Sequence, residues 1–373
     1  MRTTTRPVRG LACAVAAAFA VAPAWGLPSP PVVAAPAAPR FTADSRWMRV
    51  PERWAIGDVS AVDVDRRGRV YVLQRPRTLT GADRARAAPP VLVFAPDGRF
   101  LRGFGGPGAA YQWPTTEHSL AVDGRGHVWI AGNARLPSAA GDDMLLEFDE
   151  RGRFVRQLGQ RGASRGDDDT VDVHAPGDLF VDDAHHELYV ADGYGNRRAI
   201  VFDTRTGRFK RMWSAFGALP PADPAPEPRV KGAPFAPQDG PGPAGFNGVH
   251  AVEVSRDGLV YVSDRNNQRI QVFTRDGRYL RQVFVDRNLP SAQTASGIAL
   301  SADRTQRFLF VADWGNGQVL AFDRASLRLL GRVGADGQFV TPHLLAMDRQ
   351  GRLYVAEVQA RRVQRLTPVA AGR

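Results

Sequence analysis

The sequence predicts an all-β fold, a six-bladed β-propeller, because one short pattern recurs six times along the chain. Each copy contains two runs of apolar, β-branched and aromatic residues, separated by a polar turn that mostly contains Gly. The copies begin at residues 60, 118, 177, 250, 296 and 343. Short apolar runs cut by such turns are typical of antiparallel strands joined in hairpins.

A second pair of strands follows the first in every copy except the last. The examples are VLVFAPDGRFLRGFG (91–105), IVFDTRTGRFKRMW (200–213) and IQVFTRDGRYLRQVF (270–284). Four strands per copy and six copies in one register predict blades arranged around a channel, and argue against a β-sandwich. The last copy ends near Leu366, so we expect residues 47–50 to supply its outer strand and close the ring.

The N-terminal residues have the order of a secretory signal. Arginines precede an uncharged apolar run from Leu11 to Ala22, and Ala24-Trp25-Gly26 then offers small residues to a signal peptidase. Residues 1–26 are therefore predicted to be a signal peptide, followed by a Pro/Ala-rich tether (27–45), the propeller (46–368) and a short tail (369–373). We expect a secreted or periplasmic protein without a transmembrane segment after cleavage.

Composition narrows the chemistry. Cys13, the only cysteine, lies within the predicted signal, so a metal site in the mature chain must use His, carboxylates or carbonyl groups. The net charge of +11 is spread along the chain among Asp and Glu, without a Lys/Arg block. This distribution gives no sign of nucleic-acid binding, and we expect a monomer.

Three histidines occupy one position in alternate copies. His118, His250 and His343 each stand five residues before the Asp or Ser that ends the first strand. The equivalent residues of the other copies are small: Ser60, Gly177 and Ser296. Because first strands line the channel of a propeller, three imidazoles would converge on its axis and leave a fourth coordination position open, as in catalytic zinc sites. The alternative is that they are ordinary polar residues in a water-filled channel.

The ends of the second strands lie on the face toward which these histidines point. Arg75, Tyr194 and Arg265 fall there, and the two arginines hold equivalent repeat positions. Two guanidinium groups suit an acidic substrate group and would also stabilise a phenolate, which makes Tyr194 a candidate base. Arg265 and Asp264 have a structural alternative as polar residues between blades.

The fourth copy, GVHAVEVSRDGLVYVSDRNNQRIQVFTRDGRYL, is the clearest repeat. Its pattern resembles NHL repeats: a hydrophobic strand ends in a turn, a second strand ends in Asp, and N-x-R precedes a third strand. This resemblance covers residues 55–368. It implies a propeller but no particular activity.

A narrower resemblance rests on the segments around the candidate site. HSLAVD, VHAVEV and TPHLLAMD resemble the three zinc-histidine segments of peptidyl-α-hydroxyglycine α-amidating lyase (peptidylamidoglycolate lyase), and VADGYGNRR, VYVLQR and VSDRNNQRIQVF resemble its tyrosine and arginine segments. The resemblance implies the following roles: His118, His250 and His343 as zinc ligands, Tyr194 as the base, and Arg75 and Arg265 as its partners and carboxylate binders. The implied substrate is a peptide C-terminus or small molecule with a carboxylate, namely a peptidyl α-hydroxyglycine or a similar α-hydroxy amide. The implied reaction cleaves it to an amide and glyoxylate.

The resemblance also implies a structural calcium ion, held in part by the main-chain carbonyls of Val62 and Leu120. Leu344 stands where the family has an Asp ligand, so this set lacks its carboxylate here. Gly195 follows Tyr194 where the family has a disulfide.

Other functions remain open. A non-enzymatic envelope propeller that binds a protein or glycan would explain the repeats but not the alternating histidines. A calcium-dependent lactonase or esterase propeller would place acidic and amide side chains at the axis, where this register has His and Ser. The Pro/Gly-rich connection 218–247 lies on the face of the proposed site and is a candidate lid.

Overall fold

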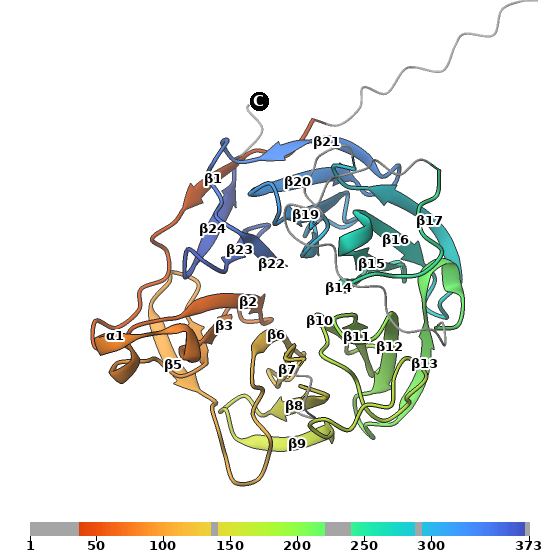
Figure 1. Cartoon of the computed structure of the whole chain (residues 1–373). Coiled ribbons are helices and arrows are strands. Elements are labelled where there is room, and N and C mark those ends of the chain that lie inside the picture. The colour runs from red at the N-terminus through yellow and green to blue at the C-terminus, as the bar shows by residue number, and fades with distance from the viewer. Residues whose placement is uncertain (1–36, 136–140, 221–239, 288–292, 370–373) are drawn as a thin grey trace, which may run out of the picture. The chain divides into compact units, whose positions relative to one another are not determined.

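Six four-stranded antiparallel sheets surround a central channel in the computed structural model (Figure 1), which describes residues 37–135, 141–220, 240–287 and 293–369. The predicted six-bladed propeller is confirmed. Each of the six copies found in the sequence forms the two inner strands of one blade, beginning with the strand nearest the channel. The predicted signal peptide, most of the tether and much of the 218–247 connection lie outside the described residues.

The strand bounds follow the repeats. Blades one and two are β2 (Asp58–Val64), β3 (Val70–Arg75), β4 (Val91–Phe94), β5 (Phe100–Phe104), and β6 (Glu117–Val122), β7 (Val128–Gly132), β8 (Met144–Phe148), β9 (Phe154–Gly159). Blades three and four are β10 (Asp178–Asp182), β11 (Glu187–Asp192), β12 (Arg198–Asp203), β13 (Phe209–Trp213), and β14 (Val249–Val254), β15 (Val260–Asp264), β16 (Arg269–Phe273), β17 (Tyr279–Phe284). Blade five is β18 (Ile298–Leu300), β19 (Phe308–Asp313), β20 (Gln318–Asp323) and β21 (Arg328–Val333).

The sixth blade joins the two ends of the chain. It contains β22 (Pro342–Met347), β23 (Leu353–Glu357), β24 (Arg362–Pro368) and, as its outer strand, β1 (Phe41–Asp44). The few helical turns are α1 (Gly81–Ala85), η1 (Pro76–Thr78), η2 (Ala215–Gly217) and η3 (Arg265–Asn267). None of the helices in the described ranges has the length and apolar character that crossing a bilayer requires.

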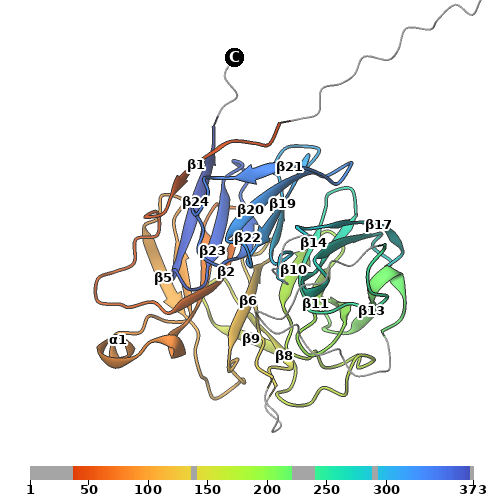
Figure 2. The same cartoon turned by 45° about the horizontal axis from the view of Figure 1, so that its top comes forward.

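The ring closes as predicted, but through a different segment. Phe41–Asp44 pairs antiparallel with β24, from Phe41 opposite Pro368 to Asp44 opposite Arg365 (Figure 2). Residues 47–50 were the expected closing strand, and residues 41–44 were assigned to the tether, so both of these predictions were wrong. The N-terminal strand thus completes the last blade and covers the edge of β24.

Trp47 explains the error. Its side chain is 2% exposed and packs against Phe94 of the first blade and Tyr354 of the sixth, with ring centroids 5.7 and 5.3 Å away. Its indole N–H donates to the carbonyl of Pro96 at 3.1 Å. The segment is therefore apolar because Trp47 packs between two blades. Composition alone does not distinguish such a segment from a strand.

The second strand of each blade carries one buried aromatic ring that packs between blades. The six residues are Tyr71, Trp129, Tyr189, Tyr261, Phe310 and Tyr354, each at most 1% exposed. Because strand side chains alternate between the two faces of a sheet, these rings fill the space between neighbouring blades. Burial of one such ring contributes about 1.5–3 kcal/mol.

An Asp or Ser at the end of each first strand shapes the following turn. Asp65 accepts hydrogen bonds from the backbone N–H groups of Arg67 and Arg69, and Asp348 does the same for Gln350 and Arg352. Gly68 follows with φ of 76°, a conformation that Gly adopts without strain. The polar residue, and in most copies the Gly, recur in the sequence because the turn needs them.

Candidate active site

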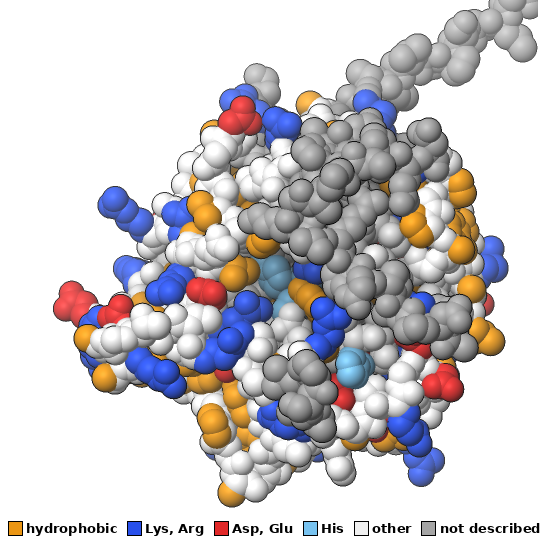
Figure 3. All heavy atoms as spheres, viewed as in Figure 1, with side chains coloured by type: hydrophobic (Ala, Val, Ile, Leu, Met, Phe, Trp, Pro, Cys, Tyr) orange, Lys and Arg blue, Asp and Glu red, His pale blue; other side chains and the backbone are white. Residues whose placement is uncertain are grey.

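The three alternating histidines converge on the channel axis. His118 of β6, His250 of β14 and His343 of β22 place one ligand nitrogen each within 4.8 Å of the others. Their ring centroids lie 4.7 to 5.2 Å apart, and each side chain is at most 4% exposed. Figure 3 shows histidine side chains at the centre of this face, with basic side chains beside them. The convergence predicted from the register is confirmed.

A β-bulge aims these side chains at the axis. In β6 the pairing passes from Glu117 opposite Gly132 to Ser119 opposite Ala131, so His118 is the extra residue. The same irregularity surrounds His250, and a corresponding one includes His343. A bulge turns a side chain away from the regular alternation of the strand. The sequence pattern gave the position of the histidines but not this device.

Main-chain carbonyls of the next blade orient two of the rings. Nδ1 of His118 lies 2.7 Å from the carbonyl oxygen of Gly177, and Nδ1 of His343 lies 2.6 Å from that of Ser60. Because a carbonyl only accepts, each Nδ1 carries the proton and each Nε2 keeps a lone pair for another partner. This is the outer-shell arrangement that metal-binding histidines show.

The ring of His250 tests whether a metal ion fits. It is 1% exposed, and neither of its nitrogens has a hydrogen-bond partner of standard geometry in the described structure. Burying an unsatisfied polar group costs about 1–3 kcal/mol. A metal ion on the axis would satisfy one of these two nitrogens, so the donor set fits such a group.

Burial keeps the three rings neutral. It lowers the pKa of His118 and His250 well below the ordinary value of histidine, with nearby His343 and Arg265 as the next causes. For His343, burial followed by the charge of Arg75 lowers the pKa to about 3. Neutral imidazole is the form that binds metals, so the site offers three lone pairs at ordinary pH.

Tyr194 and the two arginines lie at this site, as predicted. The Tyr194 hydroxyl is 3.0 Å from Nε2 of His118 and accepts a hydrogen bond of 2.8 Å from Arg265. The Arg265 guanidinium also lies 4.9 Å from the centre of the Tyr194 ring. Arg75 donates from Nε to the carbonyl of Glu117 at 2.7 Å, and burial lowers its pKa. The Arg265 hydrogen bond favours a role within the site over the interblade alternative.

Two backbone hydrogen bonds hold the Tyr194 segment. The N–H of Tyr194 donates to Ala175 at 3.2 Å, and that of Gly195 donates to His174 at 3.0 Å. The His174 ring covers Gly195 so closely that a Cβ atom there would lie 1.4 Å from its Cδ2. Where the resemblance implies a disulfide, this chain therefore has an imidazole packed on glycine. His174 has no role predicted from the sequence, because nothing in its loop pattern indicates this contact.

Glycines also let neighbouring blades approach the histidine strands. A Cβ on Gly193 would lie 2.2 Å from the backbone N and O of Val249, and one on Gly297 would lie 2.1 Å from the carbonyl of His343. Backbone atoms cannot move aside as a flexible side chain does. The close approach of the strands at the histidine layer thus depends on missing side chains.

Replacing Gly193 by Ala is expected to lower the free energy of unfolding by about 1–3 kcal/mol, because the new methyl must displace β14. The same displacement should weaken metal retention through His250. Chemical denaturation and metal content measure both effects. Gly245→Ala is the matched control: no atom lies within 4 Å of the added Cβ, so it should change little. Equal stability of the two variants would contradict the close packing.

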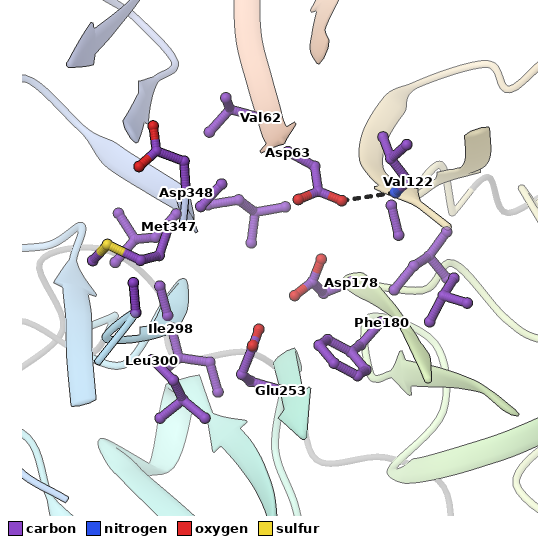
Figure 4. A pocket seen from close by; sticks show the side chains of 18 of the residues that line it. Val62, Asp63, Val122, Asp178, Phe180, Glu253, Ile298, Leu300, Met347 and Asp348 are labelled. Carbon is purple, nitrogen blue, oxygen red and sulfur yellow. Dashed lines mark hydrogen bonds between the residues drawn. The ribbon is translucent and has the colours of Figure 1, made fainter. Parts of the chain in front are cut away.

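A cavity of about 240 Å³ lies further along the same inner strands. Val62, Leu120 and Leu344 line it, and Asp63, Asp178 and Glu253 point into it (Figure 4). The calcium ion implied by the resemblance stays a prediction: Val62 and Leu120 line this cavity, and Leu344 brings an apolar side chain to it. The three acidic residues were missed by the sequence analysis, although Asp63 and Glu253 share one repeat position.

Simultaneous ionisation of these three carboxyl groups is strongly disfavoured. Burial, against hydrogen bonds from Val122 and Val64, raises the pKa of Asp63 to about 6. Burial also raises the pKa of Asp178, and burial with the charges of Asp63 and Asp178 raises that of Glu253, both well above the ordinary values. No Lys or Arg of the described ranges forms an ion pair with these three groups.

Replacing Glu253 by Gln is expected to stabilise the protein, and more so as the pH rises. Since the raised pKa keeps a proton on the folded protein that the unfolded chain releases, this carboxyl lowers stability as the pH climbs from about 4 toward the folded-state pKa. Gln should recover on the order of 1–3 kcal/mol near neutral pH, measured by urea unfolding. Exposed Glu52→Gln is the control. A destabilised Gln variant would mean instead that a cation balances the carboxylates.

Comparisons with known proteins support this type of propeller. The NHL repeat family profile matches residues 246–273. The chain is 29% identical over 350 residues to NHL repeat-containing protein 3 of Mus musculus, covering 88% of this chain and 85% of that protein, and 28% identical to its Homo sapiens counterpart. The resemblance to NHL-repeat propellers is thus confirmed.

One relative carries an activity in its name. Peptidyl-glycine alpha-amidating monooxygenase B of Xenopus laevis is 24% identical over 267 residues, which are 68% of this chain and 26% of that protein. Among solved structures, a streptogramin B lyase aligns with a TM-score of 0.55 at 13% identity, over 88% of this chain and 98% of that one. A virginiamycin B lyase from Staphylococcus aureus aligns at 0.53 and 11%, over 88% and 100%. At these identities the structural matches show the fold alone.

Proposed function

We propose that this protein is a zinc-dependent lyase that cleaves the C–N bond of a peptidyl α-hydroxyglycine, or a similar α-hydroxy amide, to an amide and glyoxylate. The observation that carries the proposal is a hydroxyl group beside the three converging histidines. The Tyr194 hydroxyl lies 3.0 Å from Nε2 of His118 and accepts a hydrogen bond from Arg265. The resemblance of the surrounding segments to peptidylamidoglycolate lyase, and the similarity to the Xenopus amidating protein, support it.

Zinc is the metal that the donor set favours. Three neutral imidazoles without thiolate or carboxylate, and an open fourth position, are typical of catalytic zinc. When bound, zinc supplies a Lewis acid that polarises the hydroxyl and carboxylate end of the substrate.

The chain's own residues divide the remaining work. Arg75 and Arg265 bring two guanidinium groups to the mouth of the histidine site, where they bind the substrate carboxylate and fix its orientation. Tyr194 lies between Arg265 and His118, so its oxygen is placed to take a proton from a hydroxyl held at the axis. The low exposure of the His118 and His250 side chains, 1% each, limits the contact of this step with bulk water.

The proposed reaction balances without a further reactant. Tyr194 accepts the proton of the α-hydroxyl, the electrons of the O–H bond form the carbonyl of glyoxylate, and the electrons of the C–N bond leave with the amide nitrogen. The nitrogen then takes one proton, the same number that Tyr194 accepted. Neither an oxidant nor a second substrate is needed.

Glyoxylate release tests the proposal. The zinc-loaded protein should release glyoxylate and peptide amide in equal amounts from a peptidyl α-hydroxyglycine, and none from the matching peptidyl glycine, which has no hydroxyl to deprotonate. A protein with stoichiometric zinc that releases no glyoxylate contradicts the lyase. The alternative of a non-enzymatic propeller that binds a protein or glycan would then be favoured.

We also propose that the protein is exported to a secreted or periplasmic location. The charged, apolar and small-residue order of residues 1–26 supports this. Cell fractionation with N-terminal sequencing tests it: a mature chain that still begins with residue 1 would contradict cleavage.

A further inference from the structure

A groove of about 610 Å³ opens on the surface between the first and second blades. Two tryptophans and five prolines account for half of the fourteen residues that line it. Prolines have no N–H to donate, and the flat rings of Trp54 and Trp113 add apolar wall. Its lining therefore suits an apolar group.

The groove begins where the candidate active site ends. Pro76 and Arg77, which line it, directly follow Arg75 in the chain, and Glu117, which also lines it, directly precedes His118. The hydrogen bond from Arg75 to the carbonyl of Glu117, 2.7 Å long, ties these two walls together. The groove therefore lies beside the histidine site, next to the segments that carry Arg75 and His118.

The walls are fixed before any ligand arrives. Trp113 is 7% exposed, and its indole N–H donates to the Glu117 carboxylate at 2.9 Å. Trp54 packs edge-on against Phe100, with ring centroids 5.0 Å apart. Because little side-chain freedom is lost on binding, such a preformed wall gives more affinity for a given contact area.

We propose that this groove is the subsite for the peptide residue that precedes the α-hydroxyglycine, and that it selects an aromatic or bulky aliphatic side chain. This inference rests on the proposed function. With the substrate carboxylate held by Arg75 and Arg265, the rest of the peptide extends toward the mouth of the channel, away from the cavity lined by Asp63, Asp178 and Glu253.

Equilibrium binding of unreactive peptides tests the groove separately from catalysis. Acetyl-Phe-Gly and acetyl-Ser-Gly lack the hydroxyl, so the zinc-loaded protein binds them without turnover, and calorimetry gives their affinities. We expect the Phe peptide to bind about tenfold or more tightly, because burial of its ring contributes that much. Trp54→Ala should remove most of this preference, whereas Trp54→Phe, which keeps an aromatic wall, should retain it. Thermal unfolding of both variants shows that the fold persists.

The outcomes separate the groove from the lyase. A preference lost in Trp54→Ala and kept in Trp54→Phe supports the subsite, and the corresponding α-hydroxyglycine peptides should then show it in kcat/KM. Equal binding of the two peptides, a preference unchanged in Trp54→Ala, or no binding of either overturns the subsite. If the preference holds but neither hydroxylated peptide releases glyoxylate, the lyase fails and the groove remains a site for an apolar peptide end.

Discussion

Replacing His250 by Ala is expected to abolish stoichiometric metal binding and, with it, glyoxylate release. The three histidines are the only His, Cys, Asp or Glu residues in the described part of the chain whose ligand atoms meet at the channel axis. Loss of one ligand leaves two imidazoles, and even outer-shell losses weaken metal sites by about 10- to 100-fold. We therefore expect affinity to fall by more than about a hundredfold. Elemental analysis after dialysis, with the wild type beside it, measures the change.

His185→Ala provides the matched control. His185 lies in the turn after β10, where its ring contacts Asp182 and is half exposed. Its loss should leave metal content and activity unchanged. Wild-type protein that holds no zinc, even after zinc is supplied, would contradict the metal centre, and a His250→Ala variant that keeps the full amount would place the ion elsewhere.

The fold could be predicted from the sequence because the repeats share one register. The turn that follows each first strand needs an Asp or Ser and usually a Gly, so the pattern that Asp65 and Gly68 represent marks the blades directly. The closing strand could not be found this way. Phe41–Asp44 is too short to show alternation, while buried Trp47 imitates a strand signal.

The site could be predicted only as far as the repeat determines it. The repeat register predicted that His118, Arg75 and Arg265 lie on one face, because a given repeat position lies at the same height in every blade. The hydrogen bond from Arg265 to Tyr194 depends on side-chain direction, and the position of His118 depends on a bulge, neither of which the pattern records. The groove at Trp54 joins residues from separate connections, which periodicity cannot bring together.

Replacing Tyr194 by Phe is expected to lower kcat by about a hundredfold to ten-thousandfold while zinc stays bound, because only the proton acceptor is removed. The phenyl ring keeps its edge-on contact with the rings of His118 and His250, whose centroids lie 5.0 and 5.7 Å away. His118 keeps its hydrogen bond to Gly177, so its orientation toward the axis persists. Rates of glyoxylate release, with zinc content measured on the same samples, give the comparison.

The matched control is Tyr279→Phe, which removes a hydroxyl from the outer strand β17, where the ring packs on Phe216 and Phe273. It should leave kcat unchanged. An unchanged kcat in Tyr194→Phe would exclude Tyr194 as the base and leave the proton to another acceptor. A large loss of zinc in that variant would instead mean that the hydroxyl holds the metal ion. A low kcat with full zinc separates proton transfer from metal binding, because His250→Ala removes the ion and Tyr194→Phe removes only the acceptor beside it.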